Sequence, residues 1–186
     1  MVRQSITCIS LLFIGCGISY YCFDKYNSIK EINNNELLTY NYLYNKNSKS
    51  NKKQYISILE IPSINFKRGL YKKKSPESEL SKNIIFLDES DMPDKKNSKV
   101  IIVGHSGAPS NAYFKNLYRL KLKDDIILYY KNKQYNYIVT DIYEIKKNGT
   151  LALESNKSNK TLTLVTCKGM DRQLVIISTL KKEKLI

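Results

Sequence analysis

The chain has 186 residues, enough for one domain and an attachment segment, and 42% of them are hydrophobic, so a core of ordinary size can form. Its net charge is +14, from 31 Lys and Arg against 17 Asp and Glu. Most of the excess is lysine scattered through loops rich in Asn and Ser, and no base-stacking platform or helix-turn-helix pattern is present. These features exclude nucleic acid as an expected partner and suit a surface that faces anionic lipid headgroups or a cell wall.

The amino terminus contains an uncharged run of 18 residues, Ile6 to Phe23, which is near the lower limit for a helix that crosses a bilayer. Tyr20 and Tyr21 lie at its outer end, where amphipathic rings favour the membrane interface. We therefore expect residues 1–24 to be an uncleaved, single-pass membrane anchor, with the rest of the chain outside the cell. A cleaved signal peptide, a lipoprotein signal at Cys16 and a buried helix of a soluble protein are the alternatives, and each fits the run less well.

Residues 25–54 are polar and are expected to form a spacer, with a short helix near Glu36–Tyr44. The folded domain is expected over residues 55–182. Runs of β-branched and aliphatic residues predict its strands at Tyr55–Ile64, Lys67–Tyr71, Ile84–Leu87, Val100–Val103, Asp124–Tyr130, Tyr135–Tyr143, Thr161–Cys167 and Arg172–Thr179.

One short packed helix is expected over Ala112–Leu120, because Phe114, Leu117 and Leu120 recur at helical spacing. Seven or eight short strands with so little helix predict a mainly β domain, a closed or nearly closed barrel.

Two residue types that carry chemistry occur once each in the expected domain. His105 is the only histidine of the chain, and it follows the predicted strand Val100–Val103 in a turn-rich stretch. The other three cysteines lie in the apolar run, so Cys167 is alone in the domain and cannot form an internal disulfide there. Cys167 is therefore either an inert core residue or a nucleophile.

The last two predicted strands, Thr161–Cys167 and Arg172–Thr179, are separated by four residues that include Gly169, which predicts a β-hairpin. If Cys167 and Arg172 close the loop as a pair, their side chains share one face, about 4.5–5.5 Å apart at Cβ. A thiol beside a guanidinium is a place where a thiolate forms or an oxyanion is held. A buried structural cysteine near a surface arginine is the alternative.

Four motifs in these contexts resemble those of the sortases, the membrane-anchored cysteine transpeptidases of Gram-positive bacteria. Leu162–Cys167 is similar to the family's TLxTC strand, and Arg172 stands where the family has an arginine after the cysteine. Val103-Gly104-His105 followed by Phe114 and Leu117 resembles its GH…F..L segment, and Leu59–Ile64 resembles its opening L.IP.I strand. The resemblance covers residues 55–180 in the family's order, behind the expected anchor.

The resemblance implies an eight-stranded barrel and a reaction without a cofactor or a metal. It implies that Cys167 cleaves a sorting signal of LPxTG type, forming a thioester that an amine of a peptidoglycan precursor or a pilin lysine resolves. His105 is then the acid and base, and Arg172 steadies the substrate carbonyl or oxyanion. Thr166 is assigned to the structure of the substrate pocket.

Ser106 departs from the pattern, because many relatives carry Arg or Asn after the histidine, and the subclass stays open. Two other functions compete with transfer to an amine. One is a surface-anchored β-barrel binding module with an inert Cys167. The other is a cysteine peptidase that hydrolyses the thioester.

Overall fold

The computed structural model describes residues 2–44, 54–107, 112–147 and 159–186, with the side chains of all of these except 2–12 and 44. The chain divides into two compact units, Met1–Leu37 and Leu38–Ile186. Residues 45–53 of the expected spacer lie outside the described part.

The amino-terminal segment is one helix, α1 (Val2–Tyr44), which covers the expected anchor and continues through residues 25–44. The sequence predicts only a short helix in that second stretch, so the observed helix is longer than expected. In the portion of the chain that the structure describes, no helix carries an apolar stretch long enough to span a bilayer. Residues 6–12 of the expected span have side chains outside that portion.

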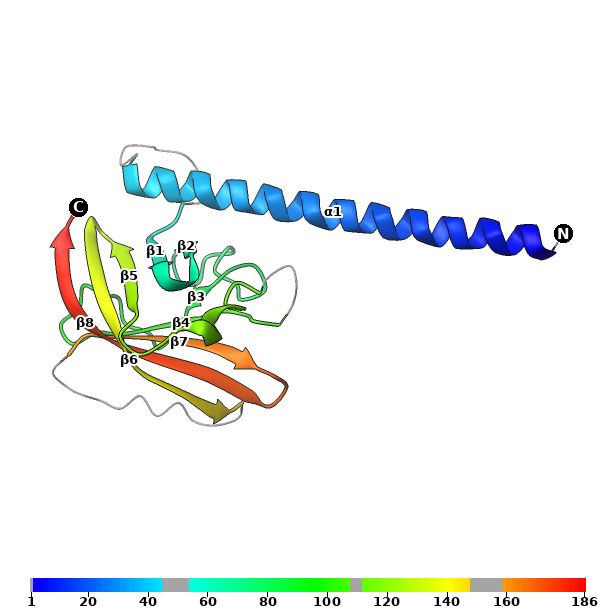
Figure 1. The fold of residues 1–186 in the computed structure, drawn as a ribbon. Helices are drawn as coiled ribbons and strands as arrows, with labels where there is room; N and C mark the ends of the chain where they lie inside the picture. The colour runs from blue at the N-terminus through cyan, green and yellow to red at the C-terminus, as the bar shows by residue number, and fades with distance from the viewer. Residues whose placement is uncertain (1, 45–53, 108–111, 148–158) are drawn as a thin grey trace. The chain divides into compact units, whose positions relative to one another are not determined.

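The second unit contains an eight-stranded sheet that curls into a nearly closed barrel (Figure 1). Its strands follow one another in the order β2-β1-β5-β6-β8-β7-β4-β3. Their bounds are β1 (Ser57–Ile61), β2 (Phe66–Leu70), β3 (Ile85–Phe86), β4 (Lys99–Val103), β5 (Asp125–Tyr130), β6 (Lys133–Lys146), β7 (Thr161–Lys168) and β8 (Arg172–Leu185). The predicted mainly β barrel is therefore confirmed, and each predicted strand contains one observed strand or overlaps it.

Alternation of side chains explains why these segments form the wall of a barrel. Along β5 and the first half of β6, every second residue is buried, because successive side chains of a strand point to opposite faces. The interior face includes Ile126, Leu128, Tyr135, Tyr137 and Val139, which belong to one continuous core cluster. The two 14-residue strands β6 and β8 bend along their length, with register shifts at Asn136/Tyr137 and at Val139/Asp141.

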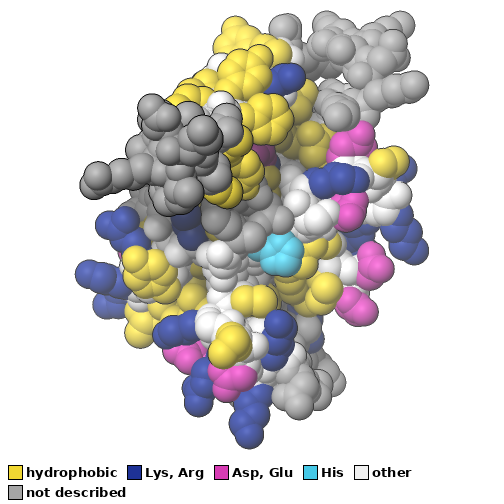
Figure 2. Space-filling model, turned by 90° about the vertical axis from the view of Figure 1, so that its right-hand side faces the viewer, with side chains coloured by type: hydrophobic (Ala, Val, Ile, Leu, Met, Phe, Trp, Pro, Cys, Tyr) yellow, Lys and Arg dark blue, Asp and Glu magenta, His cyan; other side chains and the backbone are white. Residues whose placement is uncertain are grey.

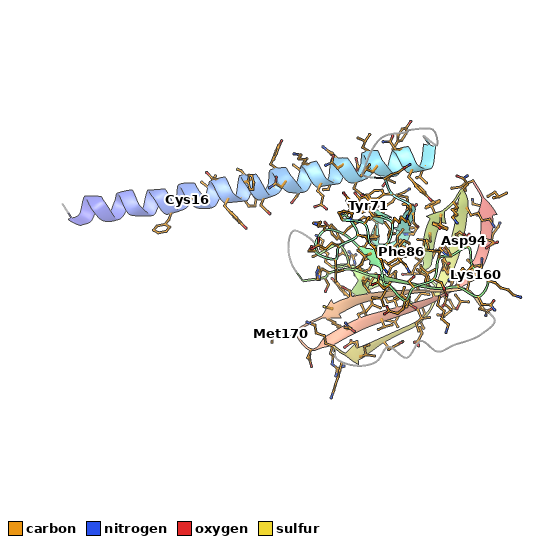
Figure 3. The ribbon with its side chains drawn as sticks, turned by 180° about the vertical axis from the view of Figure 1, so that it is seen from behind. Cys16, Tyr71, Phe86, Asp94, Lys160 and Met170 are labelled. Carbon is orange, nitrogen blue, oxygen red and sulfur yellow. The ribbon has the colours of Figure 1, made fainter. Side chains whose placement is uncertain are left out.

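The edge strands β2 and β3 are joined through Asn83, the residue two positions before β3. Its side-chain amide donates a hydrogen bond to the Gly69 carbonyl at 2.8 Å and accepts one from Arg68 Nε. Asn83 is only 2% exposed, so this link lies inside the protein. In Figure 3, Tyr71, which follows β2, and Phe86 of β3 mark the two edges that it connects.

The barrel unit contains two short 3₁₀ helices, one of which lies within the segment where a short helix is expected. The first, η1 (Pro62–Ile64), begins at the proline that ends β1, and the second is η2 (Leu117–Arg119). The short packed helix predicted over Ala112–Leu120 is present as the 3₁₀ helix η2, which is shorter than expected because turns occupy the first part of the segment. Its apolar residues are nevertheless buried as expected, with Phe114 at 1%, Leu117 at 0% and Leu120 at 5% exposure.

Candidate active site

The pairing of β4 with β7 brings the segment of His105 to the segment of Cys167. These strands form the one parallel pair among the described strands, with Val103 opposite Val165 at its end. Continuing that register by two residues places His105 level with Cys167. Each residue sits at or just past the end of its strand, where the chain leaves the sheet.

Hydrogen bonds extend this pairing past the end of β4. The Gly104 amide donates to the Val165 carbonyl at 3.2 Å, and Thr166 Oγ1 donates to the Gly104 carbonyl at 2.7 Å. Ser106 Oγ donates to the carbonyl of Cys167. The residues on both sides of His105 are therefore tied to the last residues of β7, and the two backbones run side by side at this point.

Gly104 precedes the histidine because the space beside it is filled. A Cβ at this position would lie 2.7 Å from the Phe114 ring and 2.8 Å from Ile84 Cγ2. The Phe114 amide also donates to the His105 carbonyl at 2.9 Å, which closes the turn that carries the imidazole. The spacing between the histidine and the phenylalanine thus has a structural cause.

Both predicted reactive side chains are accessible in part. Cys167 has intermediate exposure, and so does His105, whereas Thr166 of β7, whose hydroxyl bonds Gly104, is only 5% exposed. Figure 2 shows the imidazole at the surface of the protein. A cysteine fully buried in the core, which the inert-thiol alternative assumes, is not what the structure contains.

The closing hairpin differs from its expected register by one residue. Lys168 pairs with Arg172, and Cys167 pairs with Gln173, so Gln173 shares a face with the thiol. The loop is therefore three residues long, and it begins with Gly169 at φ +68°, in the left-handed region that glycine adopts without strain. The expected Cys167–Arg172 pair is wrong, because successive residues of a strand alternate between faces.

Arg172 is instead directed to Glu144 on β6. Its Nη1 lies 3.4 Å from Glu144 Oε2, and the Lys168 ammonium contacts the other carboxylate oxygen. The hydrogen bond from Lys168 is the main cause that lowers the pKa of Glu144, with smaller contributions from both cations. The Glu144 carboxylate thus holds two cations at the turn end of the hairpin, and one of them, Lys168, directly follows Cys167 in sequence.

A second, smaller cluster of apolar side chains lies on the same face of the sheet as Cys167. Ile101, Val165 and Val175 form its buried centre, and we call it the apolar sheet face. Four partly buried residues pack against that centre: Val103, Tyr143, Ile145 and Ile177. Cys167 lies two residues beyond Val165 on β7, so the thiol borders this face.

Sequence reasoning missed two residues of the hairpin region, Glu144 and Gln173. It also missed the hydrogen bond from Ser106 to the Cys167 carbonyl. Gln173 would have followed from a three-residue loop, whereas Glu144 is 28 residues from Arg172 and has no local signal. Ser106 had been noted only as a departure from the family pattern. Among the described residues, no group of three or more His, Cys, Asp or Glu side chains is arranged to hold a metal ion.

Comparison with protein families gives a match over most of the second unit. A sortase-domain model matches residues 59–181, which include His105, Cys167 and Arg172. Among curated proteins, sortase A of Bacillus anthracis is 28% identical over 121 residues. That alignment covers 65% of this chain and 56% of the relative, so this chain spans little more than half of the relative's length.

Solved structures of similar fold agree with this match. Sortase A of Corynebacterium diphtheriae superposes with a TM-score of 0.64 at 23% identity, over 76% of this chain and 67% of the other. Sortase C1 of Streptococcus agalactiae gives 0.61 at 29% identity, over 75% and 74% of the two chains. Because the family model covers well over half of its residues, this chain belongs to the sortase family.

Proposed function

We propose that this protein is a cysteine transpeptidase that cleaves a sorting signal of LPxTG type and joins the acyl fragment to an amine. Its substrates are surface proteins with a C-terminal sorting signal. The acceptor is an amine of a cell-wall precursor or a pilin lysine. The observation that carries the proposal is the β4–β7 pairing, which ties the backbones on either side of His105 to the end of β7 at Cys167.

The reaction has two acyl-transfer steps that share one acid and base. The Cys167 thiolate attacks the carbonyl carbon of the threonine in the signal, and the C–N bond to the next residue breaks as His105 gives the leaving amine its proton. The acceptor amine then attacks the thioester, His105 takes its proton, and a new C–N bond forms as the thiolate leaves. Arg172 holds the carbonyl oxygen during both steps, after its side chain leaves Glu144.

The surroundings of the thiol support binding of an extended peptide. The apolar sheet face borders Cys167, and its partly buried aliphatic members, Val103, Ile145 and Ile177, can contact the apolar residues of the signal. Lys168 and Arg172 supply positive charge at the turn end of the hairpin, where their side chains are 52% and 55% exposed.

The test is cleavage of a synthetic LPETG peptide by the purified 186-residue chain, with and without added triglycine, followed by mass spectrometry. We expect a peptide–triglycine product whose yield rises with triglycine concentration. Cys167→Ala should give no product, and His105→Ala should lower the rate by at least about 10²–10⁴-fold. Hydrolysed peptide alone at every triglycine concentration would identify a peptidase instead.

Alkylation separates the enzyme from a binding module. Iodoacetamide followed by peptide mapping reports each cysteine, so Cys167 can be compared with Cys16 and Cys22, which are exposed on α1. We expect Cys167 to react in the folded protein and His105→Ala to slow that reaction. A Cys167 that resists alkylation until the protein unfolds would support the binding module.

We also propose that the amino-terminal segment anchors the enzyme in the cell membrane, with the second unit outside. The uncharged run Ile6–Phe23 and its two interfacial tyrosines support this placement. The full chain should sediment with membranes and resist extraction by carbonate, and a chain that lacks residues 1–37 should not. Uncleaved full chain in the soluble fraction would overturn the anchor.

A further inference from the structure

We propose that Arg68, on the edge strand β2, is a positioning residue for His105. It acts through Tyr113, which lies in the turn that follows the histidine. The inference rests on the proposed function, because it assigns His105 the acid–base role. It extends that function to a residue outside the thiol's surroundings.

The first step is the bond between Phe114 and His105. The Phe114 amide donates to the His105 carbonyl at 2.9 Å, so any shift of Phe114 moves the histidine backbone. Phe114 is itself 1% exposed, and its ring lies 5.6 Å from the ring of Phe66 on β2. The position of Phe114 therefore depends on β2 as well as on the core.

The second step is Tyr113, the neighbour of Phe114. The Arg68 guanidinium carbon lies 3.5 Å from the centre of the Tyr113 ring, which is a close cation–π stack. On its other side, Tyr113 Oη donates to the Lys82 carbonyl at 3.0 Å. The tyrosine is thus held at its ring by β2 and at its hydroxyl by the segment that leads into β3.

The third step fixes Arg68 itself. Its Nε donates to Asn83 Oδ1, and the buried amide of Asn83 in turn donates to the Gly69 carbonyl at 2.8 Å. This contact uses the planar guanidinium, which donates at its edge while its face stacks on Tyr113. Lysine has no such plane, so it cannot satisfy Asn83 and cover Tyr113 together.

These three steps connect the contact between the edge strands β2 and β3 to His105, the proposed acid–base residue. Asn83, which links the edge strands β2 and β3, orients Arg68. Arg68 and the Lys82 carbonyl hold Tyr113. Tyr113 fixes the chain at Phe114, whose amide holds His105. A displacement of about 1 Å from such a remote change costs about 10²-fold in rate. The effect should appear in kcat, since nothing in this chain of contacts touches the apolar sheet face.

The experiment compares Arg68→Ala and Arg68→Lys with Lys67→Ala in the 186-residue chain. Lys67 is the matched control, because it lies on the other face of β2 and pairs with Glu60 at 3.0 Å. The chain has one histidine, so its imidazole gives one pair of ring-proton resonances, and their shift against pH is measured without any substrate. The kcat and KM for the LPETG peptide with triglycine are measured on the same samples.

We expect both Arg68 variants to lower kcat about 10- to 100-fold at nearly constant KM, and to change the imidazole titration curve. Lys67→Ala should match the wild type in both. Tyr113→Leu, which removes the stack from the other side, should reproduce the Arg68→Ala result and replaces that variant if it fails to fold. If the wild type has no peptide activity, the proposed function fails, and the imidazole titration still decides this inference.

Two results would overturn the positioning role. One is a folded Arg68→Ala protein with the wild-type titration curve. The other is full recovery of kcat in Arg68→Lys, which would mean that charge alone matters.

Discussion

Cys167 and Arg172 are five residues apart in sequence, yet the hairpin directs their side chains to different faces. The residue opposite the thiol is Gln173, whose amide can also donate to an oxyanion. The hairpin therefore offers two candidates for one role, and substitutions can separate them.

We expect Arg172→Ala and Arg172→Lys to lower kcat by about 10²–10³-fold each, the usual loss for one oriented oxyanion donor. Lysine at position 172 should not restore kcat, because it keeps the positive charge but lacks the planar pair of donors of a guanidinium. Gln173→Ala should change kcat less than tenfold. Steady-state kinetics with the LPETG peptide measures all three, and a Gln173→Ala loss as large as that of Arg172→Ala would assign the donor to Gln173.

Glu144 should compete with the substrate oxygen for Arg172, since the carboxylate and the guanidinium are paired at 3.4 Å. We expect Glu144→Gln to raise kcat/KM, by no more than about fivefold, because an exposed ion pair holds its partner weakly. Its thermal unfolding midpoint should match that of the wild type. A lower kcat/KM would show that the carboxylate positions the arginine for the substrate and does not compete for it.

At the scale of elements, the turn after β4 carries the histidine and depends on Gly104. We expect Gly104→Ala to destabilise the protein by about 1–3 kcal/mol, since the new methyl group overlaps the Phe114 ring and Ile84. Gly107→Ala is the matched control, because a Cβ added there meets no atom of the described residues within 4 Å apart from its chain neighbours. Urea unfolding measures both, and equal free energies of unfolding would contradict the packing argument.

Strands were easier to predict than the segments between them. Thr161–Cys167 is a continuous β-branched and aliphatic run, and β7 follows it with one more residue. Phe114, Leu117 and Leu120 recur at intervals of three, which fits the three residues per turn of a 3₁₀ helix better than the 3.6 of an α-helix. The sequence pattern predicted their burial and a short helix correctly, but it did not give the length of that helix.

The sequence singled out His105, Cys167 and Arg172 as candidates, but it did not give the register of the hairpin that carries two of them. A four-residue loop, 168–171, and a three-residue loop, 169–171, both fit the sequence. The structure has the shorter loop, which begins with Gly169 in the left-handed conformation. The proximity of the strands of His105 and Cys167 was inferred from the family motif, because no local pattern specifies a parallel pairing. Contacts such as Glu144 with Lys168 and Arg172 join residues 24 and 28 apart and leave no trace in a single sequence.

At the scale of the whole molecule, ion pairs set the response to acid. Hydrogen bonds from lysines are the first cause that lowers the pKa of Asp91, Asp94 and Glu183 below their ordinary values. Figure 3 shows Asp94 and Lys160 at one end of the barrel. A carboxylate whose pKa is lower in the folded protein stabilises it above the unfolded pKa, and that contribution is lost as the pH falls through the folded pKa.

We therefore expect the free energy of unfolding to be nearly constant from pH 7 to pH 5 and to decrease below about pH 4. Urea titrations at each pH measure it. Asp94→Asn, which removes the partner of Lys131, should flatten the acid side of the curve. A decrease that begins between pH 7 and pH 5 would point to groups other than these carboxylates.

The boundary of the second unit leads to a prediction about truncation. Thr39 is 7% exposed, and burial raises the pKa of Tyr42 to about 12, with Lys131, Tyr130 and Tyr135 beside it. A chain that starts at Leu38 should therefore be more stable than one that starts at Tyr55, by about 1–3 kcal/mol for the buried ring. Tyr42→Ala in the longer chain should remove most of that difference, and equal stability of the two truncations would contradict it.

The parallel pairing of β4 with β7 also orders the events of folding. The β7–β8 hairpin needs only a three-residue loop, so it forms among the earliest contacts. Joining β4 to β7 links residues 62 positions apart, and pairings of such long sequence separation form late. We therefore expect Cys167 to enter its hairpin before the turn that carries His105 joins β7, so the two candidate site residues come together only late in folding.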